Sequence, residues 1–401
     1  MIKRFNIVSR LLIFIYLGLM IIHGVFSWRY AIFRQSTPTL VYMKFLLIPT
    51  VFLIAIANGS FVANHFKALG GVVVISIYFF SVFVLKSTSL YQSVCLIWCT
   101  SFIIGYLSAY FTPYKNKEIS FWSFAYVLFP VSVYYILLHS GDFSYENTMV
   151  TTEGYWIDNN VIMVLFSLLP FVIMQKSKRY KDVAMLLVLV CAIISVKRTI
   201  IIAAFLVELI YLYNRFRNRS NIVMKLIVLV FAVVGLFYLV RYMDARFNGG
   251  ELFERLNNIV QENDSSGRED QYIVYFDIIK NTSLSNQLFG TREINDTLTG
   301  NIHNDLLYVV YHYGLLGLVL FLVVMIKIIS VVIKIVRTDC LGAEMSLACL
   351  MTLVALVICG MFNCFIVTNS YIYMMLFFGY AIGKYELIQK QLLNYQSEQS
   401  A

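Results

Sequence analysis

Runs of predominantly apolar residues recur along the whole chain, separated by short polar segments. Each run is about 17–25 residues long, the length that an α-helix needs to cross the hydrocarbon core of a bilayer. The chain of 401 residues is 60% hydrophobic and 13% charged, whereas about 25% of the residues of a typical soluble domain are charged. The sequence therefore predicts an all-α, polytopic integral membrane protein and argues against a soluble enzyme.

The runs predict about twelve transmembrane helices in a single membrane domain that covers residues 1–401. No polar segment is large enough to fold as a separate soluble domain. The first run follows Lys3 and Arg4, as in a signal peptide, but it lacks a small-residue cleavage site, so we expect it to remain as the first helix. The predicted spans are 7–26, 40–57, 69–85, 90–111, 120–139, 157–174, 182–196, 199–213, 222–240, 305–326, 344–362 and 367–383.

The positive charges predict the orientation of these spans. With the N-terminus in the cytoplasm, the inner segments carry 19 Lys and Arg residues and the short outer loops carry 5. Such a bias places both termini in the cytoplasm. The net charge of +9 is scattered over short loops, so it indicates topology rather than binding of nucleic acid. Seven cysteines form no CxxC pair, so neither a zinc site nor a disulfide framework is indicated.

Two outer segments are distinctive. The loop at 140–156 carries three acidic residues and no basic one, and the loop at 241–304 is by far the longest. A loop of this length without a span usually has a function. Within it, Ser266 and Glu269 have the spacing of a capping box. A helix is expected to follow, with one apolar face, and it lies either on the membrane surface or against neighbouring spans. That face comprises Tyr272, Tyr275, Phe276 and Ile279.

Three residues are candidates for a site on the outer face. Arg268 lies in the first turn of the expected helix, where free N–H groups and the helix dipole attract anions. Arg198 lies in a tight turn between two spans, where a fixed cation is costly without an anionic partner. His303 precedes a span and can exchange a proton at neutral pH. The alternatives are a solvated arginine, a headgroup contact and an interfacial polar residue, respectively. Gly314 and Gly317 follow, and they permit a bend or close packing of helices.

Five local patterns resemble the O-antigen polymerase and O-antigen ligase superfamily of bacterial envelope glycosyltransferases, and they follow one another along the chain in the same order as in that family. The strongest is IHNDLL at 302–307 with YGLLG at 313–317, which is similar to the H-N-x-x-L and G-x-x-G segment of that family. Ser195 to Arg198 resembles its Ser-x-x-Arg pattern. The other three are GYWIDNN at 154–160, with Asn159 where proline is common, Gly267-Arg268, and Leu288-Phe289-Gly290 closing the helix.

The resemblance implies a glycosyltransferase whose donor is an oligosaccharide on undecaprenyl diphosphate, at the outer leaflet of the bacterial inner membrane. Arg198 and Arg268 would stabilise the negative charge of the leaving diphosphate, and His303 would accept the proton of the acceptor hydroxyl. Asn160 and Asn304 would bind sugar or phosphate, or cap helices. Tyr272 and Tyr275 would stack on sugars or pack in the core. No D-x-D-like metal motif or nucleotide-binding loop is evident, so we expect no metal and no cofactor.

Four functions stay open at this stage. A polymerase of O-antigen or capsule repeat units is favoured, and a ligase that transfers glycan to lipid A core shares the same patterns. For either enzyme, the expected partners are membrane lipids, a chain-length regulator and a flippase, with no nucleic acid. The third function is that the chain is itself a flippase or transporter. Such a protein would often show two similar halves, but no repeat is evident. Its clearest intramembrane charges would be Lys44 and Glu208. A non-enzymatic scaffold or sensor would not need Arg198, Arg268 and His303 on one face.

Overall fold

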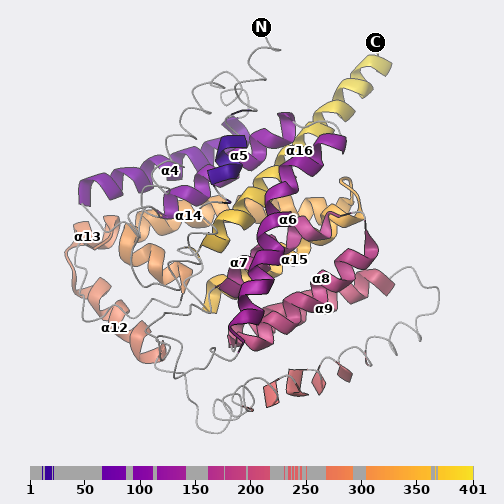
Figure 1. Cartoon of the computed structure of the whole chain (residues 1–401). Coiled ribbons are helices and arrows are strands. Elements are labelled where there is room, and N and C mark those ends of the chain that lie inside the picture. The colour runs from indigo at the N-terminus through magenta and orange to yellow at the C-terminus, as the bar shows by residue number, and fades with distance from the viewer. Residues whose placement is uncertain are drawn as a thin grey trace.

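The computed structural model describes residues 11, 14–19, 21, 66–86, 94–111, 115–140, 161–175, 177–195, 197–216, 230, 234–235, 237–238, 240–242, 244–245, 250, 268–291, 304–362, 366 and 369–400. The regular secondary structure of these residues is helical throughout (Figure 1), which confirms the all-α class. The helices are α4 (Phe66–Lys86), α5 (Val94–Phe111), α6 (Lys115–Leu138), α7 (Val161–Ile173), α8 (Lys178–Ile194), α9 (Arg198–Phe216), α12 (Arg268–Asn281), α13 (Leu284–Phe289), α14 (Asp305–Thr338), α15 (Ala343–Phe362) and α16 (Asn369–Ser400).

Most of the predicted spans coincide with helices. Each of α4 to α9 and α14 to α16 covers one predicted span, with ends that differ by a few residues except where α14 and α16 run on past their predicted ends. Within the described residues, α14 and α15 are long and apolar enough to cross a membrane, and shorter apolar stretches occur at Leu69–Val82, Phe124–Leu138 and Val161–Ile173. The predicted span 40–57, most of 7–26 and of 222–240, and nearly all of the 140–156 loop lie outside the described residues.

Short connections make successive helices antiparallel. Only a few residues separate α7 from α8, α8 from α9, and α14 from α15. The α14–α15 turn has Asp339 in the left-handed conformation, with its N–H bonded to the carbonyl of Ile335. We use "outer end" for the end of the bundle at which α9, α14 and α16 begin, and "inner end" for the opposite one. The last turns of α16 extend beyond the other helices at the inner end (Figure 1).

Helices α5 and α16 are in backbone contact. A Cβ added at Gly105 would lie 2.0 Å from the carbonyl oxygen of Leu376, and one added at Gly379 would lie 2.0 Å from that of Phe102. Gly383 follows Gly379 by one turn, and its Cβ would lie 2.7 Å from the carbonyl oxygen of Tyr106. This is the small-xxx-small arrangement that lets two helices approach closely where lipid surrounds them. The register makes the two helices parallel and places them at the centre of the bundle.

Helix α14 is broken at Gly314. The glycine has φ 69° and ψ −177°, so the residues before and after it form two helical segments with different axes. Gly317 lies against Tyr313 and Tyr78, because a Cβ there would meet side-chain atoms at 2.4 and 3.2 Å. The predicted bend and close packing at this place are confirmed. The helix itself continues to Thr338, twelve residues past the predicted end of the span at residue 326.

Within residues 268–291, the long loop forms two helices rather than the single helix predicted there. The helix expected after the Ser266–Glu269 capping box is present from Arg268, and the closing turn at Gly290 is confirmed, whereas Ser266 lies outside the described residues. However, α12 ends at Asn281, and Ser283 caps a new helix by accepting a hydrogen bond from the N–H of Asn286 at 3.4 Å. A side chain that satisfies the first N–H groups of a helix favours a fresh start over continuation.

The predicted apolar face of α12 is only partly correct. Tyr275 is buried, and Tyr272 and Ile279 pack against the core. Phe276 was assigned to the same face, but it is 62% exposed. Because adjacent residues of a helix point about 100° apart, Phe276 lies on the flank next to Ile273, which is also exposed.

Candidate functional site

The structure gives a position to three of the five predicted site residues. Arg198 is the first residue of α9, and Arg268 is the first residue of α12. Asn304 precedes α14 and is its N-cap. His303 and Asn160 lie outside the described residues. The described part of the site is therefore a set of three helix N-termini.

The starts of α9 and α14 share the outer end because α15 packs between these two helices. Cys359, near the end of α15, interacts electrostatically with both Lys197 and Asp305. These two residues are the neighbours of Arg198 and Asn304 in the sequence. The end of α15 thus lies beside both helix starts, which brings residues about 100 positions apart in the sequence into one region.

Asn304 makes two hydrogen bonds that fix the start of α14. Its Oδ1 accepts from the N–H of Leu307 at 3.0 Å, which is the N-cap bond. Its Nδ2 donates to the carbonyl of Met361 in α15 at 3.2 Å. The capping role that was one alternative for Asn304 is present, and a contact with substrate stays a prediction.

Asp305 is a functional candidate that the sequence reasoning missed. It is 5% exposed, and its Oδ1 accepts a hydrogen bond from the backbone N–H of Ile366 at 2.7 Å. Its Oδ2 faces Gly360, where an added Cβ would come within 2.7 Å of that oxygen. The carboxylate therefore joins the start of α14 to the turn between α15 and α16. The sequence did not predict this burial, because an acidic residue in the first turn of a helix is explained by its favourable interaction with the helix dipole.

The break in α14 frees carbonyl groups, and the outer loop satisfies them. Thr291, 4% exposed, donates to the carbonyl of Tyr311 from its N–H at 2.9 Å and from its hydroxyl at 3.2 Å. The hydroxyl of Tyr78 in α4 donates to the carbonyl of Tyr313 at 2.7 Å. A buried carbonyl without a hydrogen bond costs several kcal/mol, so these donors are what permits the break.

An aromatic contact places α12 against the outer segment of α14. The rings of Tyr275 and Tyr311 lie edge to face with centroids 5.1 Å apart and an interplanar angle of 81°. Tyr275 is two turns from Arg268, which is about 10 Å along the helix axis. The middle of α12 is therefore held against the outer segment of α14 by packing. The stacking on sugars that the resemblance implied for Tyr275 does not match this buried position, and core packing, the other alternative, does.

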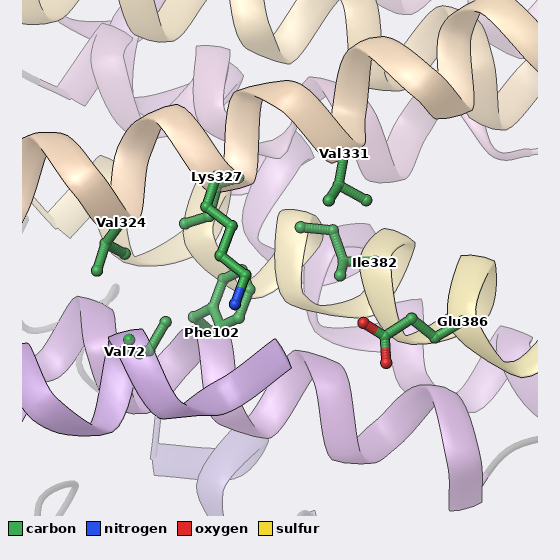
Figure 2. A pocket seen from close by; sticks show the side chains of 9 residues that line it. Val72, Phe102, Val324, Lys327, Val331, Ile382 and Glu386 are labelled. Atoms are coloured by element: carbon green, nitrogen blue, oxygen red, sulfur yellow. The ribbon is translucent and has the colours of Figure 1, made fainter. Parts of the chain in front are cut away.

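A small cavity lies toward the inner end of the bundle. Figure 2 shows Lys327 of α14 and Glu386 of α16 on either side of it, with the Lys327 chain pointing toward Phe102. The Glu386 carboxylate accepts a hydrogen bond from the Tyr106 hydroxyl at 2.5 Å. The cavity volume is about 30 Å³, enough for about one or two water molecules but not for a sugar ring. This cavity is therefore not the site for a glycan.

Charged side chains at the inner end link α8 to its neighbours. Lys181 forms an ion pair with Glu344 of α15. Asp182 accepts a hydrogen bond from the Tyr211 hydroxyl at 2.5 Å and pairs with Arg215 at 3.3 Å, both in α9. These contacts connect the helix ends opposite to Arg198, so they account for charged residues that the outer site does not use.

Glu208 in α9 is buried, and its Oε2 has no hydrogen-bond partner among the described residues. It is one of the two charges that the sequence predicted to lie within the membrane, and the other, Lys44, lies outside the described residues. In the same part of the chain, no group of three or more His, Cys, Asp or Glu residues could hold a metal ion.

Comparison with known protein families and with curated proteins found no match for this chain.

Proposed function

We propose that this protein crosses the bacterial inner membrane about twelve times, with both termini in the cytoplasm, and polymerises the repeat units of a surface polysaccharide. The donor would be an oligosaccharide on undecaprenyl diphosphate, and the acceptor a hydroxyl of another lipid-linked repeat unit. One observation carries the proposal. Helices that begin at Arg198, at Arg268 and one residue after Asn304 are packed together through α15 and the Tyr275–Tyr311 contact.

Helix N-termini suit a diphosphate ligand. Each presents free N–H groups and the positive end of the helix dipole, and two of these three begin with an arginine. Guanidinium groups bind phosphate oxygens through two parallel hydrogen bonds. Such helix ends would supply positive charge to a leaving diphosphate without a metal ion.

The reaction breaks the bond between the anomeric carbon and the diphosphate oxygen, and the bonding electrons leave with the diphosphate. The acceptor hydroxyl oxygen forms the new bond to that carbon, and its proton passes to a base. His303 is our candidate for the base because histidine is the side chain that most often takes a proton in such steps. Arg198 and Arg268 stabilise the charge that grows on the leaving diphosphate. Asn160 and Asn304 would bind sugar or phosphate beside it.

Deletion and complementation in the native host test this function. The surface polysaccharide of the deletion strain is separated on a gel, and the strain is complemented with wild type, R198A, R268A or H303A. Arg215→Ala and Lys280→Ala are matched controls, because these cations lie at the far ends of α9 and α12. The amount of each variant in the membrane is measured in parallel.

A polymerase predicts that the deletion strain carries single repeat units, that the three site variants fail to restore long chains, and that both controls restore them. A ligase predicts instead that the core carries no repeat while lipid-linked polymer accumulates. Unchanged polysaccharide, or full complementation by the three site variants, would refute the proposed enzyme and favour a flippase or a scaffold.

A further inference from the structure

Helices α12 and α13 carry a row of exposed apolar side chains. Phe276 and Leu284 are 62% and 70% exposed, and Ile273, Leu288 and Phe289 also face outward. These five residues are defined here as the apolar flank. The opposite side of α12 is buried through Tyr275. The apolar flank is thus not the face that packs on the bundle, and it needs another explanation.

The level of the apolar flank along the bundle is fixed by backbone contacts. A Cβ added at Gly314 would lie 2.3 Å from the carbonyl oxygen of Leu288, and one at Gly290 would lie 2.2 Å from that of His312. The hydrogen bonds from Thr291 to the carbonyl of Tyr311 fix the same junction. The end of α13 therefore sits directly against the break in α14.

The break at Gly314 also separates a segment of α14 with polar side chains from an apolar segment. Its nine residues before Gly314 include Asp305, His312 and three tyrosines, and most of them are buried. The twelve residues after it, 315–326, contain no charged, hydroxyl or amide side chain. They rise about 18 Å, and they present an outward apolar surface made of Leu315, Leu316, Val319, Leu322, Val323 and Ile326.

An outward surface of this kind is what a helix presents to acyl chains. In a membrane-spanning α14, the hydrocarbon region would therefore begin at Gly314 rather than at Asp305. The end of α13 lies at the same level, because a Cβ at Gly314 would lie 2.3 Å from the carbonyl oxygen of Leu288, so the apolar flank adjoins the start of this surface. The polar residues Asp277, Lys280 and Ser285 of the two helices are exposed as well, as expected at the boundary between headgroups and chains.

We propose that α12 and α13 lie in the interface of the outer leaflet, with the apolar flank in contact with phospholipid acyl chains. Amphipathic helices bind there by burying apolar side chains about 5–10 Å deep. Continuity with α14 favours lipid over a second copy of the chain as the occupant. This inference rests on the proposed membrane-spanning arrangement, and it places the start of α12, with Arg268, at the depth of lipid phosphates.

Photo-cross-linking of the full-length protein in phospholipid nanodiscs tests the proposal. A benzophenone amino acid replaces Phe276 or Leu288 in separate variants, and lipid adducts are measured by mass spectrometry. Replacement of the exposed polar residues Asp277 and Ser285 gives matched controls on the same helices. Replacement of Val319 in α14 gives the reference for a lipid-facing position. We expect adducts at 276 and 288 in several-fold excess over 277 and 285, and comparable to 319.

Three results would overturn the proposal in different ways. Lipid adducts at 319 but not at 276 and 288 would remove α12 and α13 from the membrane and leave the proposed function intact. Adducts at 276 and 288 to a second copy of the chain would make the apolar flank a dimer interface. Absence of lipid adducts at 319 would contradict the membrane-spanning arrangement itself, and the proposed function with it.

Discussion

The carboxylate of Asp305 accepts a hydrogen bond from the backbone N–H of Ile366 at 2.7 Å, across 61 residues of sequence. The bond joins the start of α14, two residues after His303, to the turn that follows α15. Substitution of Asp305 by Ala is expected to leave that buried N–H without a partner, at a cost of about 1–3 kcal/mol. Asp305→Asn keeps an acceptor oxygen and should cost less.

Thermal unfolding in detergent measures this difference, and the complementation assay measures its effect on polysaccharide. We expect Tm to fall in the order wild type, D305N, D305A. Equal Tm values for D305A and wild type would show that the Ile366 hydrogen bond does not stabilise the turn.

Gly290 and Gly342 form a matched pair for testing the junction between α13 and α14. Both have φ +90°, but a Cβ at Gly342 meets nothing within 4 Å, whereas one at Gly290 would lie 2.2 Å from the carbonyl oxygen of His312. Gly342→Ala should therefore cost only the backbone strain, about 1–3 kcal/mol. Gly290→Ala should cost that strain and should also push α13 away from α14. We therefore expect protease to cleave the 241–304 loop faster in this variant. Identical cleavage rates for the two variants would mean that α13 is not docked at the break.

The glycines between α5 and α16 predict a strong dependence on side-chain size. Gly105→Ala and Gly379→Ala each place a methyl group 2.0 Å from a carbonyl oxygen, so the two helices must move apart, at a cost on the order of 1–3 kcal/mol. Gly71→Ala is the control, because its Cβ would meet only the Val324 side chain, at 3.3 Å, and alanine favours the helix. In size-exclusion profiles after heating, the peak of folded protein should disappear at a lower temperature for G105A and G379A than for G71A. If G71A proves the least stable of the three, the close α5–α16 contact is not what stabilises the bundle.

The ion pair between Lys181 and Glu344 is unequally exposed. The Lys181 side chain is 8% exposed and that of Glu344 is 53% exposed. Glu344→Met leaves a buried cation without its partner and should destabilise by about 1–3 kcal/mol, less than a fully buried pair because Glu344 faces solvent. The double variant K181M/E344M removes both charges and should be more stable than E344M alone. A double variant less stable than E344M would show that the charges are not coupled.

Many features followed from local rules in the sequence. Apolar runs of bilayer length predicted nine helices in the described part of the chain, because a backbone removed from water must bond to itself. The start of α12 at Arg268 and the turns at Gly290 and Gly314 were also predicted, since a helix cap and a positive φ depend on residues within a few positions.

Other features depended on contacts between distant residues. Asp305 is a buried acceptor only because the turn at Ile366 folds over it, and no spacing in the sequence relates these two positions. The predicted single helix from 268 to 290 is divided by Ser283. The exposed position of Phe276 depends on how α12 is rotated against α14, since helical periodicity gives the faces of a helix but not which face meets a neighbour.

By itself, therefore, the sequence determined the helical class of this protein, the approximate bounds of its helices and the places where the chain can turn. These follow from hydrogen bonding and from conformational preferences within a few residues of one another. Only the tertiary structure decided that the start of α9 at Arg198 and the N-cap of α14 at Asn304 lie on either side of the end of α15. It also decided that α5 and α16 are in backbone contact and that Thr291 fills the break at Gly314. These arrangements depend on packing between residues as far apart in the sequence as Phe102 and Gly379, where shape and unsatisfied backbone groups select the partners.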